Sequence, residues 1–243
     1  MKIKTRQIIF IVSVAFNIVA IIFLIDKFFL HHQSELPPTN PITDSQTTSA
    51  LNSTPQQNKT LLTLFKSMPH DTSDIVFLGA SLTQNFPLIE FFKDSRLKNR
   101  GLGGNTIKDI QNRLNEVTDG NPSKIFLEVG SVDIAHNLPT DSIFGNLVKI
   151  ISTIKLKTPK TKIYVQSVLP FGFDNIAPIQ AYNTKVALYC ASNKITFINL
   201  YPSFLGDRSL KNELSLDGYH LTAAGYVIWK NILAPYLKPN HVQ

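Results

Sequence analysis

Two short stretches of the sequence combine residue types that can carry out nucleophilic catalysis together. Ser81 lies in the stretch Gly79-Ala80-Ser81-Leu82-Thr83, directly after an apolar run. Asp217 and His220 lie three residues apart, just before the last helical pattern. A serine hydroxyl becomes a nucleophile when an imidazole accepts its proton, and a carboxylate can fix the tautomer of that imidazole. Ser81, His220 and Asp217 therefore point to acyl transfer.

Each stretch also has a simpler structural interpretation. A serine between a strand and a helix most often caps the helix, and Asp217–His220 can serve as a capping segment with an exposed histidine. The adjacent residues Gly103 and Gly104 permit positive φ, so a backbone N–H can face a ligand oxygen, but they can equally form a tight turn. The three stretches in one chain favour chemistry more than any one of them alone.

The elements that would position these residues follow from the apolar pattern. Short apolar runs alternate with segments of helical spacing, which is typical of a parallel sheet with helices on both faces. The carboxyl ends of such strands form the usual site, which places Ser81, Gly103, Gly104, Asp133 and the loop after Leu200 on one rim. Strands are predicted over 75–79, 98–102, 124–129, 162–168 and 195–200, and helices over 106–117, 142–156, 179–191 and 223–237.

Four blocks in this order resemble the SGNH hydrolases, also called GDSL-type lipases and esterases. They cover Asp74 to about Trp229, and the chain is most similar to the subgroup of platelet-activating-factor acetylhydrolase-like esterases. The blocks are Gly79-Ala80-Ser81-Leu82-Thr83, Asn99 to Thr106, Gly130-Ser131-Val132-Asp133 and Asp217 to Tyr226. The resemblance implies a flavodoxin-like three-layer α/β/α fold.

The resemblance also implies roles for individual residues. Ser81 would be the nucleophile, His220 the general base and Asp217 its orienting partner. The backbone N–H groups of Ser81 and Gly104 would form the oxyanion hole. Acyl transfer through an acyl-enzyme is implied, with water as the usual acceptor, and no metal or cofactor is implied.

Two positions depart from the family pattern. Val132 stands where the family has an asparagine whose side-chain amide donates to the oxyanion, and Ala80 replaces an aspartate. Loss of one such donor costs about 10²–10³ in rate. Asn105, Asn85 or Asn137 is a candidate substitute donor, and Asn105, Val132 and Asp133 are candidate substrate contacts. A slow esterase, a transferase and a catalytically inactive binding or scaffold protein all remain open.

The N-terminus resembles a membrane anchor. Lys2, Lys4 and Arg6 precede an apolar run from Ile8 to Ile25, which as a helix is about 27 Å long and close to the thickness of the bilayer core. Residues 1–30 are therefore predicted to be a transmembrane signal anchor; a cleaved signal peptide is the alternative. The basic flank predicts a cytoplasmic N-terminus and a C-terminal domain on the periplasmic or extracellular face.

Composition agrees with a tethered domain. Residues 31–60 are polar and predict a flexible linker, which leaves 61–243 as the hydrolase-like domain. Of the net charge of +7, residues 31–243 carry only +4, scattered and without a nucleic-acid motif, so nucleic-acid binding is not expected. The single cysteine excludes an intramolecular disulfide.

The sequence thus predicts a membrane-anchored serine esterase acting on an ester-bearing small molecule, lipid or envelope glycan. Two further features have open interpretations. Glu128, at the end of a strand, is expected to have a structural hydrogen-bonding role. Phe171, Phe173 and Phe204 either form an acyl-binding wall or fill the core.

Overall fold

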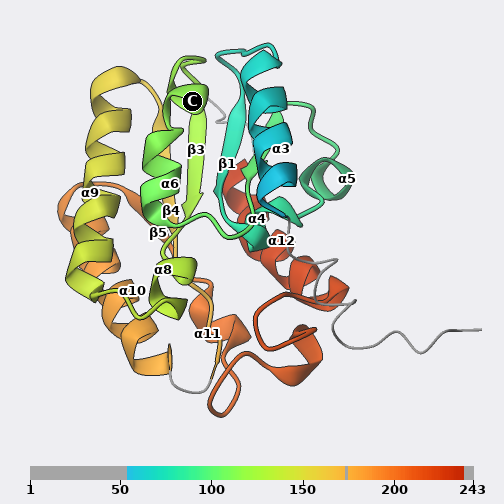
Figure 1. Cartoon of the computed structure of the whole chain (residues 1–243), viewed down its shortest axis with the longest axis vertical. Coiled ribbons are helices and arrows are strands. Elements are labelled where there is room, and N and C mark those ends of the chain that lie inside the picture. Colours follow the sequence, from blue (N-terminus) through green and yellow to red (C-terminus); the bar gives the residue numbers. More distant parts are fainter. Residues whose placement is uncertain (1–53, 173–174, 238–243) are drawn as a thin grey trace, which may run out of the picture. The chain divides into compact units, whose positions relative to one another are not determined.

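A computed structural model describes residues 54–172 and 175–237 and contains one parallel five-stranded sheet (Figure 1). The strand order is β2-β1-β3-β4-β5, so the chain starts near the middle of the sheet and adds strands first on one side and then on the other. This confirms the predicted α/β class and all five predicted strands. Their bounds are β1 Ile75–Gly79, β2 Leu97–Gly101, β3 Lys124–Glu128, β4 Lys162–Gln166 and β5 Thr196–Ile198.

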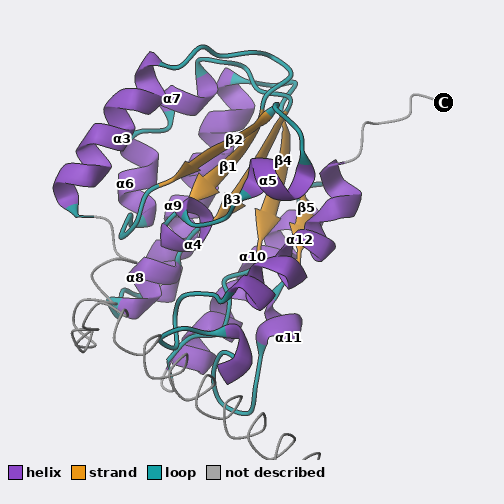
Figure 2. Ribbon diagram, turned by 90° about the vertical axis from the view of Figure 1, so that its right-hand side faces the viewer, coloured by secondary structure: helices purple, strands orange, loops and turns teal. Residues whose placement is uncertain are grey.

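Helices cover both faces of the sheet (Figures 1 and 2). The long ones are α3 Pro55–Ser67, α9 Thr140–Lys157, α10 Ile176–Ser192 and α12 Ala223–Leu237. The short ones lie in the connections that follow β1, β2, β3 and β5, and several of them carry residues of the rim. They are α4 Ser81–Gln84, α5 Leu88–Phe92, α6 Ile107–Asn112, α7 Asn115–Thr118, α8 Ser131–Ala135, α11 Tyr201–Phe204 and the 3₁₀ turn η2 Asn212–Leu214.

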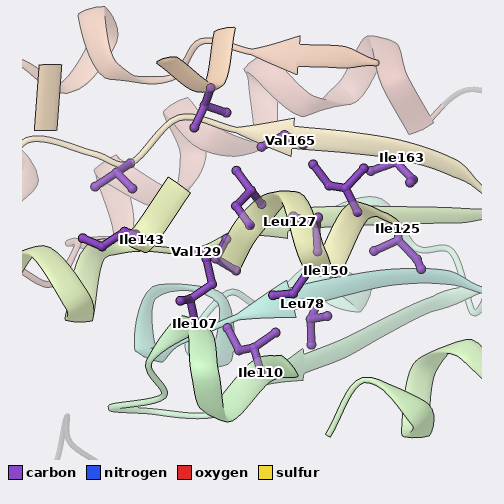
Figure 3. Packing of buried hydrophobic residues seen from close by; sticks show 14 of the residues in the cluster. Leu78, Ile107, Ile110, Ile125, Leu127, Val129, Ile143, Ile150, Ile163 and Val165 are labelled. Atoms are coloured by element: carbon purple, nitrogen blue, oxygen red, sulfur yellow. The ribbon is translucent and has the colours of Figure 1, made fainter. Parts of the chain in front are cut away.

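The strands separate two apolar cores because their side chains alternate between the faces. In β1, Val76 and Leu78 face a core made with α6 to α10, which Figure 3 shows in close-up. Ile75 and Phe77 face the opposite core, made with α4, α5, α11 and α12 and centred on the fully buried Trp229. Strands buried on both sides are what a parallel sheet requires.

Two predicted segments differ from the structure. The helix expected over 106–117 is two helices, α6 and α7, separated at Arg113 and Leu114. The predicted linker 31–60 is wrong from residue 55 onward, because α3 begins at Pro55. Thr54 caps this helix by a reciprocal capping box with Gln57, and Pro55 occupies its first turn. These are sequence-level helix signals that the polar composition obscured.

Within residues 54–172 and 175–237, no helix is both long enough and apolar enough to cross a bilayer. The anchor predicted over residues 1–30 lies outside the described residues, as does the linker up to residue 53.

Glu128 is the least expected feature of the sheet. It is the last residue of β3, it is completely buried, and neither of its carboxylate oxygens has a hydrogen-bond partner among the described residues. The expected hydrogen-bonding role is therefore wrong. Burial raises the pKa of Glu128 from 4.5 to about 7, because a low-dielectric surrounding disfavours the charged form.

This raised pKa predicts a pH-dependent stability that Glu128→Gln should remove. Between about pH 4.5 and 7 the folded protein holds a proton that the unfolded chain releases, so the wild-type free energy of unfolding falls as pH rises and then levels off. We expect Glu128→Gln to be about 2–3 kcal/mol more stable than wild type at pH 8 and nearly equal to it at pH 4.5, by urea denaturation. An equal difference at both pH values would contradict this explanation.

Candidate active site

The nucleophile candidate sits where β1 turns directly into α4. Two glycines make this turn possible: a Cβ on Gly79 would lie 2.2 Å from the Thr83 hydroxyl oxygen, and one on Gly101 would lie 2.1 Å from the backbone nitrogen of Gln84. Both distances are far shorter than a van der Waals contact, so neither position can carry a side chain larger than hydrogen. The glycines therefore allow α4 to lie directly on the ends of β1 and β2, which places Ser81 at the carboxyl edge of the sheet. In Figure 2 the central strands point toward α4 and α8.

Ser81, His220 and Asp217 form a continuous hydrogen-bonded chain. The Ser81 Oγ lies 3.1 Å from His220 Nε2, and His220 Nδ1 lies 2.7 Å from Asp217 Oδ2. With Asp217 ionised, the proton of the neutral imidazole is on Nδ1 and Nε2 can accept the serine proton. The structure thus brings together the three residues that the sequence predicted to meet, although 139 positions separate Ser81 from His220.

The loop before α12 fixes the Asp217 carboxylate firmly. The backbone N–H groups of His220 and Tyr219 both donate to Asp217 Oδ1, at 2.7 and 2.9 Å. Burial acts to raise the pKa of Asp217, but these two backbone donors and the His220 ring favour its charged form, and the pKa lies below its usual value. The aspartate therefore stays ionised and orients the imidazole at neutral pH.

Ser81 and His220 open onto a cavity of about 260 Å³. A hollow of about 710 Å³ lies at the opposite, amino edge of the sheet, but its lining includes no hydroxyl–imidazole pair in the described residues. Chemistry rather than volume therefore identifies the site. Its lining consists of Ser81, Leu82, Gly104, Ser131, Val132, Ala135, Phe171, Asp217, Tyr219 and His220.

The predicted oxyanion-hole region is only partly as expected. Gly104 lines the cavity, as does Val132, whose side chain has no donor. Asn105 and Asp133 do not line it: Asn105 accepts a hydrogen bond from Arg113 Nε at 2.9 Å, and Asp133 is buried and accepts from the Ile107 N–H at 2.9 Å. The structure therefore does not support these two residues as substrate contacts.

Neither Asn85 nor Asn137 lines the cavity, so neither is placed as the substitute donor. The polar side chain beside Val132 is Ser131, which sequence reasoning missed. Its position within the third block was the available signal.

The apolar wall of the cavity also differs from the expectation. Phe171 contributes to it, and its ring centroid lies 5.2 Å from that of Tyr219, which the sequence did not single out. Phe204 is buried in the core on the α12 face, so the alternative of core filling holds for this residue. Phe173 lies outside the described residues.

A buried arginine ties the first two sequence blocks together. Arg113 Nη2 donates to the backbone oxygens of Gly79 and Arg100, at 3.3 and 2.8 Å, and Nη1 lies 2.5 Å from Glu116 Oε1. Both side chains of this ion pair are almost fully buried. Burial lowers the pKa of Arg113 and raises that of Glu116, while the attraction between the two charges opposes both shifts.

No group of three or more potential metal-ligating side chains occurs in the part of the chain that the structure describes.

Comparison with known proteins identifies the family. The model of the GDSL-like lipase/acylhydrolase family matches residues 71–228, more than half of the chain. The chain belongs to this family. A comparison with curated proteins finds no match.

Solved structures agree with this assignment. A GDSL-like lipase from Bacteroides thetaiotaomicron superposes with a TM-score of 0.68 at 26% identity, covering 74% of this chain and 96% of that one. A proposed platelet activating factor from Streptococcus pneumonia gives 0.68 and 26%, covering 75% and 94%. A proposed acylhydrolase from Bacteroides fragilis gives 0.67 and 26%, covering 73% and 94%. The predicted family membership is confirmed, and the family is one of hydrolases that act on esters.

The Arg113–Glu116 pair yields a prediction on stability. Arg113→Met leaves Glu116 buried without its partner and removes the donors to two strand-end carbonyls. We expect it to lower the free energy of unfolding by about 3–5 kcal/mol, measured by urea denaturation. The double variant Arg113→Met, Glu116→Met should recover part of the loss, because it buries no unpaired charge.

The matched control is Lys185→Met, which breaks an ion pair with Asp141 in which both side chains are substantially exposed. It should cost less than about 1 kcal/mol. A loss of similar size in Arg113→Met and in Lys185→Met would contradict the structural role of Arg113.

Proposed function

We propose that this protein is a serine esterase that removes a small acyl group from an alcohol through an acyl-enzyme on Ser81. The observation that carries the proposal is the hydrogen-bonded chain from Ser81 through His220 to Asp217, open to a cavity. Membership of the GDSL-like lipase/acylhydrolase family supports the same reaction class.

The geometry supports two balanced steps. Ser81 Oγ attacks the ester carbonyl carbon while His220 Nε2 takes its proton, and collapse of the tetrahedral intermediate expels the alcohol, which receives that proton. Water then attacks the acyl-serine and gives a proton to His220. Collapse of the second tetrahedral intermediate expels Ser81 Oγ, which takes that proton from His220, and releases the carboxylic acid. The negative oxygen formed in each step would be stabilised by the backbone N–H groups of Ser81 and Gly104.

The size of the cavity favours a short acyl group. Its volume of about 260 Å³ is at or below the small end of ordinary ligand pockets, which run from about 300 to 1,000 Å³. Val132, Ala135 and Phe171 bound it with apolar surface. An acetyl group on an envelope glycan, a lipid or another small ester is the substrate that we infer.

The position in the cell is part of the proposal. Residues 1–30 combine a basic flank with an apolar run long enough to span a bilayer. We infer that this segment anchors the domain outside the cytoplasm, on the periplasmic or extracellular face, where envelope esters are available.

A covalent probe tests the nucleophile. A fluorophosphonate should label Ser81 in the folded protein because His220 removes its proton, and mass spectrometry of the labelled peptide should locate the adduct at Ser81. Ser81→Ala should be unlabelled, and Asp217→Asn should lose about 10²–10⁴ in ester turnover. Folded wild-type protein that neither reacts nor turns over esters would refute the proposal.

Val132 allows a test of catalytic strength. Val132→Asn places an amide donor on the cavity wall, and we expect it to raise kcat by about 10–10² while KM changes little. Turnover of p-nitrophenyl acetate measures both constants, and Val132→Leu is the control without a donor. Activity that appears only after Val132→Asn is combined with Ala80→Asp would instead indicate a native protein that binds without catalysis.

A further inference from the structure

Asn58 contacts the loop of Gly103 and Gly104, which is the proposed oxyanion loop. This asparagine lies outside the region that matches the family model. It lies in the first half of α3, and its Nδ2 donates to the backbone oxygen of Gly103 at 2.7 Å. The family match begins only at residue 71. We infer that Asn58 is a positioning residue for the oxyanion hole; this inference rests on the proposed esterase function.

The geometry of one peptide links Asn58 to the Gly104 N–H. The carbonyl of Gly103 and the N–H of Gly104 belong to the same planar peptide unit, in which they point in opposite directions. A donor that fixes the direction of the Gly103 carbonyl therefore fixes the direction of the Gly104 N–H. Gly104 is the second proposed backbone donor and lines the cavity.

This peptide needs external support because it joins two glycines. Gly104 has φ of +72°, and a Cβ there would meet nothing within 4 Å. Glycine crosses between backbone regions at little steric cost, so side chains contribute little to holding the peptide in one orientation. On the other side of Gly103, its N–H donates to Gln84 Oε1 at 2.5 Å. Asn58 and Gln84 thus hold the carbonyl and the N–H of one glycine from two different helices.

Helix α3 is itself held in place at its other end. Phe65 is buried, and the guanidinium carbon of Arg100 lies 4.7 Å from the centroid of its ring. Thr54 caps the helix four residues before Asn58. The packing of Phe65 on Arg100 holds the backbone of α3 against the sheet, and the cap begins the helix just before the residue that contacts Gly103.

The absence of a donor at Val132 makes this contact more important. With an asparagine there, a misdirected Gly104 N–H would leave two of the proposed donors; with Val132, it leaves one of them, the Ser81 N–H. A hydrogen bond on the Gly103 carbonyl also polarises the peptide and strengthens the Gly104 N–H as a donor. Asn58 is therefore expected to act on the transition state rather than on substrate binding.

The test replaces Asn58 by aspartate in the full chain. Asn58→Asp keeps the shape of the side chain but removes its donor. We expect kcat for p-nitrophenyl acetate to fall by about 10–10² with KM within about threefold of wild type. Backbone amide exchange in peptides that span residues 102–106 should become faster. The control Asn112→Asp adds the same charge at an exposed position in the same groove between α3 and α6, and it should change neither reading.

The two readings separate the inference from the proposed function. If wild type turns over esters and Asn58→Asp matches Asn112→Asp in kcat and exchange, the positioning role is refuted and the esterase stands. If wild type neither turns over esters nor reacts with a fluorophosphonate, the esterase fails. In that case backbone amide exchange over residues 102–106 still tests the positioning role of Asn58. An unchanged exchange rate in Asn58→Asp refutes the inference. A faster rate supports Asn58 as the residue that orients this peptide.

Discussion

The geometry at the carboxyl edge of the sheet depends on the hydrogen bonds of one buried guanidinium group. Arg113 must find partners for its donors away from water, and it finds them in Glu116 and in backbone carbonyls at the ends of β1 and β2. Those strand ends lead directly into Ser81 and into the Gly103–Gly104 loop. Because breaking a buried pair is costly, the relative position of Ser81 and the Gly103–Gly104 loop is coupled to global stability.

The proposed site relies on backbone more than on side chains. Ala80 and Val132 remove two polar side chains that the family pattern provides, whereas the Ser81–His220–Asp217 chain is complete. Backbone donors cost nothing in side-chain entropy, but they work only if the peptide planes are held. The contacts to Gly103 from Gln84 and Asn58 meet this need.

Sequence reasoning succeeded where a pattern is local. The alternation of apolar runs with helical patterns located all five strands, and the last pattern, over 223–237, located α12 with its observed bounds. It failed where long-range contacts decide. The apolar spacing continues through Leu114 and Val117, so it could not reveal that Arg113 interrupts the helix. Nor could spacing assign Asn105 to Arg113 instead of the cavity, or bring Asn58 to a glycine 45 positions away.

Helix α3 also bears on where the functional unit begins. A protein trimmed to the matched region, residues 71–228, would keep Ser81, Asp217 and His220, yet it would lose Asn58, the ring of Phe65 on Arg100 and the buried Trp229 of the second core. The same helix is the first described element after the segment that leads from the N-terminus. A cut in the chain before Thr54 would leave the rim and its contact with Asn58 together, whereas a cut just after Asn58 would separate the rim from that contact.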